Sequence, residues 1–225
     1  LTKMLDVLRY WKITYHIDGF HIMGEGISQE LFMKDPLLAD CKLFFHDIDG
    51  SCVFHGKVPK FKNAAEYNEG FLYSMRHVLK GDENMTEEFM FRQKRNPLCN
   101  GVINYMADQD GFTVMDMVSY EERHNEANGE GNQDGISYNC SWNCGAEGST
   151  RKTSIKELRL KQMKNAFSLL LFSQGTPLIF QGDEWGNTQK GNNNVWCQDN
   201  ELSWIDWNGR KNQEKLWEFV KRAIQ

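Results

Sequence analysis

Short apolar segments that end in polar residues recur along the chain, and this pattern limits the fold most strongly. The segments cover residues 17–23, 41–48, 101–110 and 176–184. Each has the length of a buried strand, and the last is entered through Gly175 and Pro177, which favour a break after the preceding helix. Helical segments lie between them. Strands that alternate with helices predict an α/β architecture with a parallel sheet.

Three segments have the spacing of amphipathic helices. Near the beginning of the chain, Leu5, Leu8 and Trp11 recur at helical intervals. Residues 158–171 carry an apolar face, and Ser154-x-x-Glu157 before it has the pattern of a capping box. A third helix is predicted over residues 214–224. Residues 121–150 are instead polar and rich in Gly and Asn, and a loop of that length is usually functional or disordered.

The composition limits the class of protein. With 225 residues, 40% hydrophobic and 25% charged, the chain suits one globular domain over residues 1–225. A net charge of −5 does not favour nucleic acid as a partner, and no apolar run reaches the ~20 residues of a membrane span. Six widely spaced cysteines predict reduced thiols and a cytoplasmic location. Cys140-x-x-x-Cys144 lacks a second pair of ligands nearby, so we expect no metal and no cofactor.

Acidic and imidazole side chains gather where the predicted strands end. Barrel enzymes carry their active sites at the carboxyl ends of the strands, so these residues would meet at one rim. They are His21, Glu25, His46, Asp47, Asp49, Asp108, Asp110, Asp183 and Glu184. Two carboxylates that flank a sugar suit glycoside hydrolysis. Alternatively, the same residues form the turns and helix caps that commonly follow buried strands.

Three longer stretches carry a family resemblance: DQDGFTVMDMVSYEERHNEANGEGNQDG at residues 108–135, NCSWNCGAEG at residues 139–148, and the stretch that begins LLLFSQGTPLIFQGDEWG, at residues 169–207. The chain resembles the isoamylase and glycogen-debranching branch of the α-amylase superfamily of glycoside hydrolases over nearly its whole length. This resemblance implies a partial TIM (β/α)8 barrel, about strands four to eight. It also implies α-glucan substrates such as glycogen or starch, and retaining hydrolysis of α-1,6 branch points.

The same resemblance implies that the catalytic positions have changed. The family's fourth strand reads Asp-Gly-Phe-Arg-x-Asp, and here His21 replaces the Arg and Met23 replaces the nucleophile. His46 takes the place of the general acid Glu, and Gln109 takes the place of a His. Asp110 alone keeps the family's residue, at the position that stabilises the transition state. A thioether cannot form the glycosyl ester that a carboxylate forms, so we expect impaired catalysis.

Neighbouring residues could replace the lost groups or hold the sugar. Glu25 and Asp47 lie close to the altered positions, but a shift of two residues along a strand moves a carboxylate by ~6.6 Å, further than catalysis tolerates. The predicted substrate-binding residues are His21, Gln109, Asp183, Glu184, Asn193 and Gln198. For the Asn-rich run at residues 191–194, hydrogen bonds within the loop are an equally open interpretation.

The resemblance also implies that strands one to three of the barrel and the β-sandwich that follows it are missing. An open sheet exposes its edges and its interior face, so we expect a homo-oligomer or association with the missing amino-terminal half of the barrel. The expected interior residues are Phe20, Ile22, Phe44 or Phe45, Ile103, Tyr105 and Ile179.

Three functions remain open from the sequence. The first is a debranching-type α-glucan protein with impaired catalysis that acts by glucan binding or assembly. The second is an active retaining α-1,6-glucosidase that uses altered residues. The third is a structural half-barrel that acts only as a subunit. Hydrolysis of glycogen or pullulan separates the first two, and affinity for glucan separates the first from the third.

Overall fold

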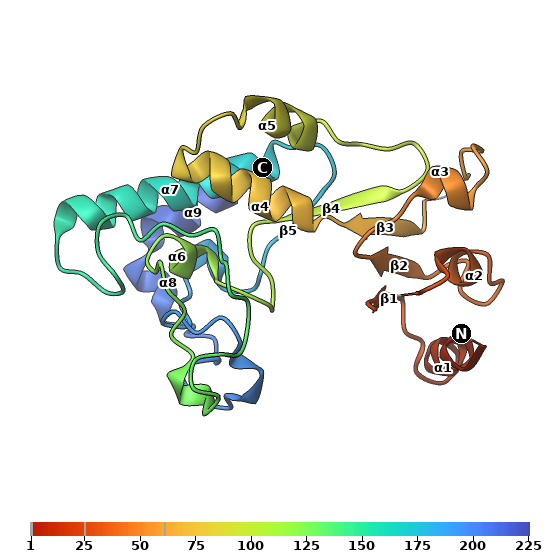
Figure 1. The fold of residues 1–225 in the computed structure, drawn as a ribbon, viewed down its shortest axis with the longest axis horizontal. Helices are drawn as coiled ribbons and strands as arrows, with labels where there is room; N and C mark the ends of the chain where they lie inside the picture. Colours follow the sequence, from red (N-terminus) through yellow and green to blue (C-terminus); the bar gives the residue numbers. More distant parts are fainter. Residues whose placement is uncertain (1, 25, 61) are drawn as a thin grey trace. The chain divides into compact units, whose positions relative to one another are not determined.

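A computed structural model describes residues 2–24, 26–60 and 62–225. Within this part of the chain, five strands form one sheet in the order β1-β2-β3-β4-β5 (Figure 1). They are β1 (Gly19–Ile22), β2 (Lys42–Phe45), β3 (Ala64–Tyr67), β4 (Gly101–Tyr105) and β5 (Thr176–Leu178). The pairs β1–β2, β2–β3 and β3–β4 are parallel. The predicted α/β class with a parallel sheet is therefore confirmed.

Helices connect the strands. Their bounds are α1 (Thr2–Tyr15), α2 (Gln29–Met33), α3 (Gly50–Val53), α4 (Glu69–Lys80), α5 (Thr86–Gln93), α6 (Val114–Met117), α7 (Thr153–Leu171), α8 (Gly209–Asn212) and α9 (Glu214–Ile224), with single 3-10 turns η1 (Glu126–Asn128), η2 (Asp183–Trp185) and η3 (Val195–Cys197). The helix α9 has the predicted bounds. The capping box is wrong, because α7 is already helical at Thr153 and its N-cap residue is Lys152, with no side-chain cap. None of the helices in the described residues is both long and apolar enough to cross a membrane.

The chain divides into two compact units, each with its own hydrophobic core. Unit 1 consists of Leu1–Glu69, Arg95–Asn104 and Gln174–Thr176. Unit 2 consists of Gly70–Lys94, Tyr105–Ser173 and Pro177–Gln225. A single barrel domain over residues 1–225 stays a prediction.

The core of unit 1 lies between the sheet and its helices. Ile22 and Phe45 are buried in the same cluster as Leu5 of α1 and Phe32 of α2. Alternate strand residues point to opposite faces of a sheet, and His21 is paired with Phe44 in register, so these two occupy the other face. Ile22 and Phe45 thus pack on the helix side. The expected interior place of Ile22 is wrong, as is that of Phe20, which packs against the same cluster. Of the alternatives Phe44 and Phe45, Phe44 lies on the other face.

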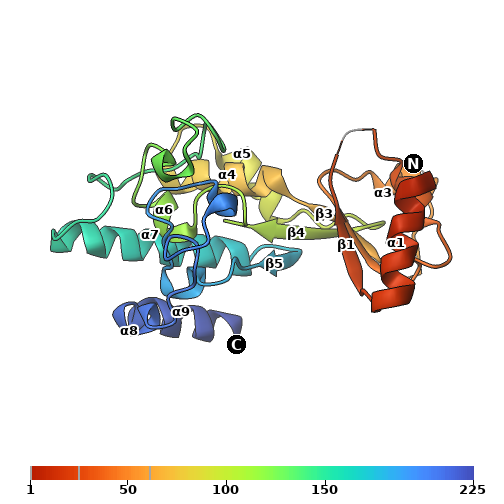
Figure 2. The same cartoon turned by 90° about the horizontal axis from the view of Figure 1, so that it is seen from below.

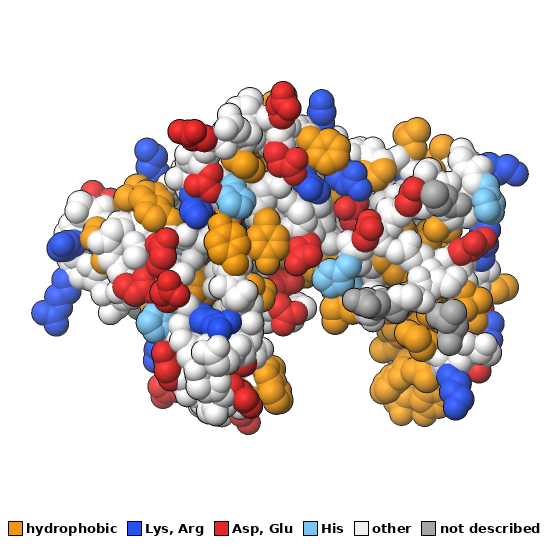
Figure 3. All heavy atoms as spheres, viewed as in Figure 1, with side chains coloured by type: hydrophobic (Ala, Val, Ile, Leu, Met, Phe, Trp, Pro, Cys, Tyr) orange, Lys and Arg blue, Asp and Glu red, His pale blue; other side chains and the backbone are white. Residues whose placement is uncertain are grey.

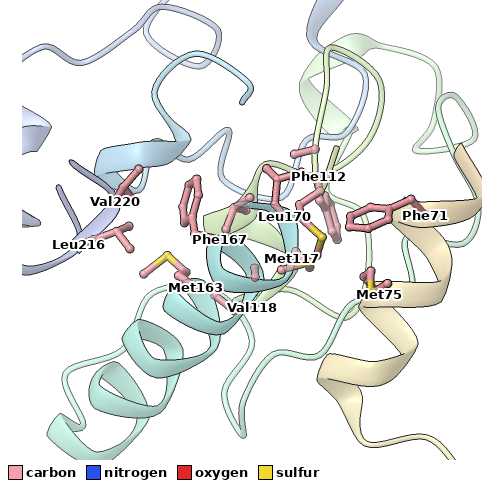
Figure 4. Packing of buried hydrophobic residues seen from close by; sticks show 14 of the residues in the cluster. Phe71, Met75, Phe112, Met117, Val118, Met163, Phe167, Leu170, Leu216 and Val220 are labelled. Carbon is pink, nitrogen blue, oxygen red and sulfur yellow. The ribbon is translucent and has the colours of Figure 1, made fainter. Parts of the chain in front are cut away.

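The core of unit 2 is built around α7. Met163, Phe167 and Leu170 of this helix are buried together with Leu216 and Val220 of α9. Figure 4 shows these side chains directed toward one another, with Phe71 and Met75 of α4 on the other side of α7. The helices α7 and α9 lie side by side (Figures 1 and 2). The apolar residues that recur at helical spacing in these two segments are therefore the residues that pack between the two helices.

Candidate functional site

Three rings cluster where the strands of unit 1 end. His21 lies in β1, His46 follows β2 directly, and Tyr67 is the last residue of β3. The ring centroids of His21 and Tyr67 are 4.4 Å apart, those of His21 and His46 are 5.4 Å apart, and those of His46 and Tyr67 are 5.9 Å apart. Two residues at altered catalytic positions are thus brought together, with Tyr67 beside them. We refer to these residues as the ring cluster.

Sequence reasoning missed Tyr67 because no strand was predicted at residues 64–67. Its two alanines and one glutamate do not form an apolar run. The register pairs Phe45 with Glu66, which places His46 next to Tyr67. Glu66 itself is buried and accepts hydrogen bonds from Arg95, a partner that local periodicity cannot reveal.

The position after β1 carries an exposed thioether. Met23 is 55% exposed and lies directly beyond the end of the strand. Glu25, the proposed substitute for the nucleophile, lies outside the described residues. Asp47 is exposed, and its backbone carbonyl accepts a hydrogen bond from Gln29. Asp49 accepts from the backbone N of Ser51 at 3.0 Å in the first turn of α3, so its carboxylate caps a helix.

The segment after β4 presents one exposed carboxylate. Asp108 is buried, and its Oδ1 accepts from the backbone N of Asp110 at 3.0 Å. Asp110 is exposed, and Gln109 Nε2 donates to its Oδ2 at 3.4 Å. The turn then passes through Gly111, whose φ of +99° suits glycine. Asp110 is thus held by its backbone while its carboxylate remains available to stabilise positive charge.

Arg76 holds both ends of this segment. The guanidinium is buried in unit 2, where it donates to the backbone carbonyl of Met106 at 2.6 and 3.1 Å and to that of Phe112 at 3.1 Å. It also donates to the carbonyl of Asn139 at 2.7 Å. Burial lowers the pKa of Arg76, although nearby Asp183 and Asp108 favour its charge. One cation thereby fixes the backbone on either side of Asp110.

Asp183 and Glu184 make local structural contacts. Asp183 is buried, and its Oδ1 accepts from the backbone N of Val114, the first residue of α6, at 3.0 Å. Burial raises the pKa of Asp183 well above its usual value, and the nearby carboxylates of Asp116 and Glu184 raise it further. Glu184 Oε2 accepts from the backbone N of Gly182 at 2.9 Å. Contact of either residue with a sugar stays a prediction.

Asparagine side chains join the two long loops of unit 2. Asn193, 2% exposed, donates from Nδ2 to the carbonyl of Ile136 at 2.7 Å and to Asn139 Oδ1 at 2.9 Å. Its Oδ1 accepts from Asn125 Nδ2 at 2.8 Å. Gln198 Nε2 donates to Asn128 Oδ1 at 2.8 Å. We call these bonds the asparagine network.

The network gives the loop of residues 121–150 a definite conformation. Asn193 could contact a sugar only if its present hydrogen bonds broke. Hydrogen bonds between the loops therefore explain the position of Asn193 in this structure. The sugar-binding roles of Asn193 and Gln198 stay predictions.

The predicted site residues are divided between the two units. His21, Met23 and His46 belong to unit 1. The others, in unit 2, are Gln109, Asp110, Asp183, Glu184, Asn193 and Gln198. Their convergence at one rim stays a prediction. Among the described residues, no three His, Cys, Asp or Glu side chains are grouped to hold a metal ion.

Asp116 should make the stability of the chain depend on pH. Its carboxylate accepts from Thr188 Oγ1 and from the backbone N of Gln189, and burial raises its pKa to about 6. A raised folded-state pKa means that the folded chain binds the proton more tightly. The resulting stability is fully present below the usual value of 3.8 and is lost as the pH rises through about 6. The difference between the usual and the folded-state pKa corresponds to about 3 kcal/mol of folding stability.

Urea denaturation between pH 4 and pH 8 should therefore show a smaller fall in the free energy of unfolding for Asp116→Asn than for the unchanged chain. An asparagine can still accept from Gln189 and donate to Thr188. Asp183, whose pKa is raised by burial, contributes part of the pH dependence of stability that remains in this variant. Glu83→Gln, at an exposed position, serves as the control. An identical pH dependence in Asp116→Asn and the unchanged chain would contradict the assignment.

No family model matches the chain, but curated proteins do. The glycogen operon protein GlgX homolog of Mycobacterium bovis is 39% identical over 248 residues, which cover 99% of this chain and 34% of that protein. The glycogen debranching enzyme of Erwinia tasmaniensis is 37% identical, covering 100% of this chain and 37% of the enzyme. Isoamylase 3 of Oryza sativa is 37% identical, covering 91% of this chain and 29% of the isoamylase. The chain thus spans about a third of the length of these relatives.

Solved pullulanase structures share the fold. Pullulanase type I from Bacillus subtilis, complexed with maltose, has a TM-score of 0.65 at 18% identity and covers 99% of this chain and 32% of its own. A pullulanase from Anoxybacillus, complexed with maltotetraose, has a TM-score of 0.61 at 18% identity, with 99% of this chain and 33% of that one covered. The identity of 37% to 39% to curated debranching proteins over nearly the whole chain shows that the chain belongs to the isoamylase and glycogen-debranching family of glycoside hydrolases.

Proposed function

We propose that this chain is part of a debranching-type α-glucan protein that binds glucan but no longer hydrolyses it. One observation carries the proposal: Met23 follows β1 and His46 follows β2, at the positions where the family resemblance implies the nucleophile and the general acid. Both side chains are exposed. Because the chain spans about a third of its relatives, the proposal concerns the function of this portion.

The chemistry of the replacing side chains supports the loss of hydrolysis. Retaining hydrolysis needs one carboxylate that attacks the sugar and one acid that protonates the leaving oxygen. The thioether of Met23 does not ionise and cannot form a glycosyl ester. The imidazolium of His46 can donate a proton, but no covalent intermediate would follow. Asp110 can stabilise positive charge, which aids a reaction only when the other groups are in place.

Glucan binding is supported by two observations. Two of the similar pullulanase structures are complexes with maltose and maltotetraose. Within the ring cluster His46 is exposed, His21 is half-buried and Tyr67 is buried, so the two imidazoles are the rings that a ligand can reach. Their ring faces and polar edges suit a sugar ring that has apolar faces and hydroxyl groups around its rim.

The ring cluster gives a direct test of binding. Isothermal titration of the 225-residue chain with maltoheptaose should show binding, and His46→Ala should weaken it about threefold or more, since a ring contact is lost. Lys42→Ala is the matched control, because Lys42 is exposed at the opposite end of the same strand. If His46→Ala and Lys42→Ala bind maltoheptaose with equal affinity, the ring cluster is not part of the binding surface.

We also propose that the chain associates with a second copy or with a chain that supplies further strands. The strand β1 lies at the edge of the sheet, and α1 buries only Leu5. Its exposed apolar side chains are Met4, Val7, Tyr10, Trp11, Ile13 and Tyr15, and Figure 3 shows apolar side chains gathered over this helix. Exposed apolar patches of this kind favour association. Light scattering checks this, and a monodisperse particle of 26.2 kDa would contradict it.

A cytoplasmic location belongs to the same proposal. Among the described side chains, Cys41, Cys99, Cys140, Cys144 and Cys197 are free thiols, as expected in a reducing compartment. Cell fractionation tests it, and recovery of the protein outside the cytoplasm would contradict it.

A further inference from the structure

Three asparagines of the chain directly precede a glycine, at residues 100, 128 and 208. An Asn-Gly pair is prone to spontaneous deamidation, because glycine has no side chain to hinder its backbone nitrogen from attacking the preceding side-chain amide. The reaction needs an amide that can rotate towards this nitrogen. Hydrogen bonds to the asparagine side chain therefore decide which of the three pairs reacts in the folded chain.

The side chains of the first two asparagines are held in place. Asn100 is 2% exposed, and its Nδ2 donates to the carbonyl of Gly101 at 2.9 Å. Asn128 belongs to the asparagine network, where its Nδ2 donates to Asp134 Oδ2 at 2.7 Å and its Oδ1 accepts from Gln198 Nε2 at 2.8 Å. Either amide can rotate only after these hydrogen bonds break, which requires a local opening of the structure.

The side chain of Asn208 is exposed and is not held. Asn208 is the N-cap residue of the single-turn helix α8, and within the described ranges of the chain its amide group makes no hydrogen bond. Backbone hydrogen bonds do not distinguish this site from that of Asn128. The N–H of Gly209 donates to the carbonyl of Asp206 at 3.0 Å, and the N–H of Gly129 donates to that of Glu126 at 3.2 Å. The two sites thus differ in the freedom of the asparagine side chain.

We propose that Asn208 is a site of spontaneous deamidation in the folded chain. The backbone nitrogen of Gly209 attacks Cγ of Asn208, a C–N bond forms, and the bond from Cγ to the amide nitrogen breaks. The proton of the attacking N–H leaves with that nitrogen as ammonia. Water then opens the cyclic imide at either carbonyl, which gives aspartate or isoaspartate. The reaction consumes one water, releases one ammonia and needs no other reactant.

The products change the charge and the packing next to two tryptophans. Both products add a negative charge two positions from Asp206, and isoaspartate also adds one atom to the backbone between Trp207 and Gly209. A Cβ at Gly209 would already lie 3.4 Å from Cδ1 of Trp185, and the ring centroids of Trp185 and Trp207 are 5.5 Å apart. The longer backbone must therefore displace Gly209 or Trp207 from Trp185. Because Trp185, Asp206 and Gly209 line an open pocket of about 860 Å³, deamidation alters the wall of this pocket.

Peptide mapping by mass spectrometry, on the 225-residue chain incubated at mildly alkaline pH, tests the site. In the folded chain, Asn208 should lose its amide at least about tenfold faster than Asn128, whose side-chain hydrogen bonds must open first. In concentrated urea all three asparagines should react at similar rates, because each precedes a glycine. Gly209→Ala is the matched variant. It keeps Asn208 but places a methyl group on the attacking residue, where a Cβ meets its neighbours at ordinary contact distances, so it should slow the reaction at Asn208 alone.

Two results of the mapping would overturn the proposal. Equal rates at Asn208 and Asn128 in the folded chain would show that side-chain hydrogen bonds do not select the site. An intact Asn208 in the folded chain, after a period in which the chain in urea has reacted, would show that the turn before α8 holds this residue as firmly as the network holds Asn128.

Tryptophan fluorescence tests the effect on packing. During the same incubation the emission should drift in the unchanged chain and stay constant in Asn208→Gln, because glutamine forms the corresponding imide far more slowly. A drift of equal size in Asn208→Gln would refute the displacement of Trp185 and Trp207. Thermal melts before incubation confirm that each variant is folded.

Discussion

Incubated with pullulan or glycogen, the 225-residue chain should release no detectable reducing ends. The nucleophile position carries Met23 and the general-acid position carries His46, and losing such groups typically lowers the rate by several orders of magnitude. A reducing-sugar assay, with an active pullulanase as the positive control, gives the measurement. Asp110→Asn identifies contamination, because a contaminant's trace activity would be the same in this variant.

Detectable release of reducing ends by the chain would contradict this prediction. Turnover that disappears when Glu25 is changed to Gln would show that a displaced carboxylate acts as the nucleophile, and the chain would be an active glucosidase with altered residues. Turnover that survives Glu25→Gln but disappears in Asp110→Asn would also restore an enzyme, with its nucleophile elsewhere. Either outcome would refute the loss of hydrolysis while leaving glucan binding intact.

Replacing Arg76 with Met should lower the free energy of unfolding by about 3–5 kcal/mol. The guanidinium donates to the carbonyls of Met106, Phe112 and Asn139, and all three would lose this partner within the core of unit 2. Methionine has a similar length and stays apolar, so the change removes the hydrogen bonds with little loss of volume. Urea denaturation followed by tryptophan fluorescence provides the measurement.

Arg151→Met is the matched control, since Arg151 is exposed and its replacement should change stability by less than about 0.5 kcal/mol. If the two variants unfold at the same urea concentration, the hydrogen bonds of Arg76 contribute no net stability. In that case the energetic cost of burying the cation, which also lowers its pKa, must cancel their contribution.

Periodicity in the sequence predicts much of the fold but little of the site. The helix at residues 214–224 and the strands β1, β2, β4 and β5 follow from patterns of apolar residues, because burial acts on neighbouring positions in the chain. The strand β3 lacks such a pattern. Its Glu66 is buried through a contact with Arg95, which lies 29 positions away. Periodicity among neighbouring residues cannot reveal a pairing between residues so far apart in the sequence.

The roles of the acidic residues depend on still more distant partners. Asp183 and Asp110 look alike in the sequence, as polar residues beyond buried strands. In the structure Asp183 is buried and bound to the backbone of Val114, 69 positions away, whereas Asp110 is exposed. Only the three-dimensional arrangement separates a carboxylate that caps a helix from one that can meet a ligand.

The asparagine network also constrains the order in which the chain can fold. Asn193 is bonded to Asn125 and Asn139, which lie 68 and 54 positions earlier. Contacts across such separations form after local ones, because a long stretch of chain must first be brought together. During synthesis, residues 121–150 therefore cannot reach their final conformation until residue 193 has left the ribosome. Until then, this loop lacks these partners and is open to proteases and chaperones.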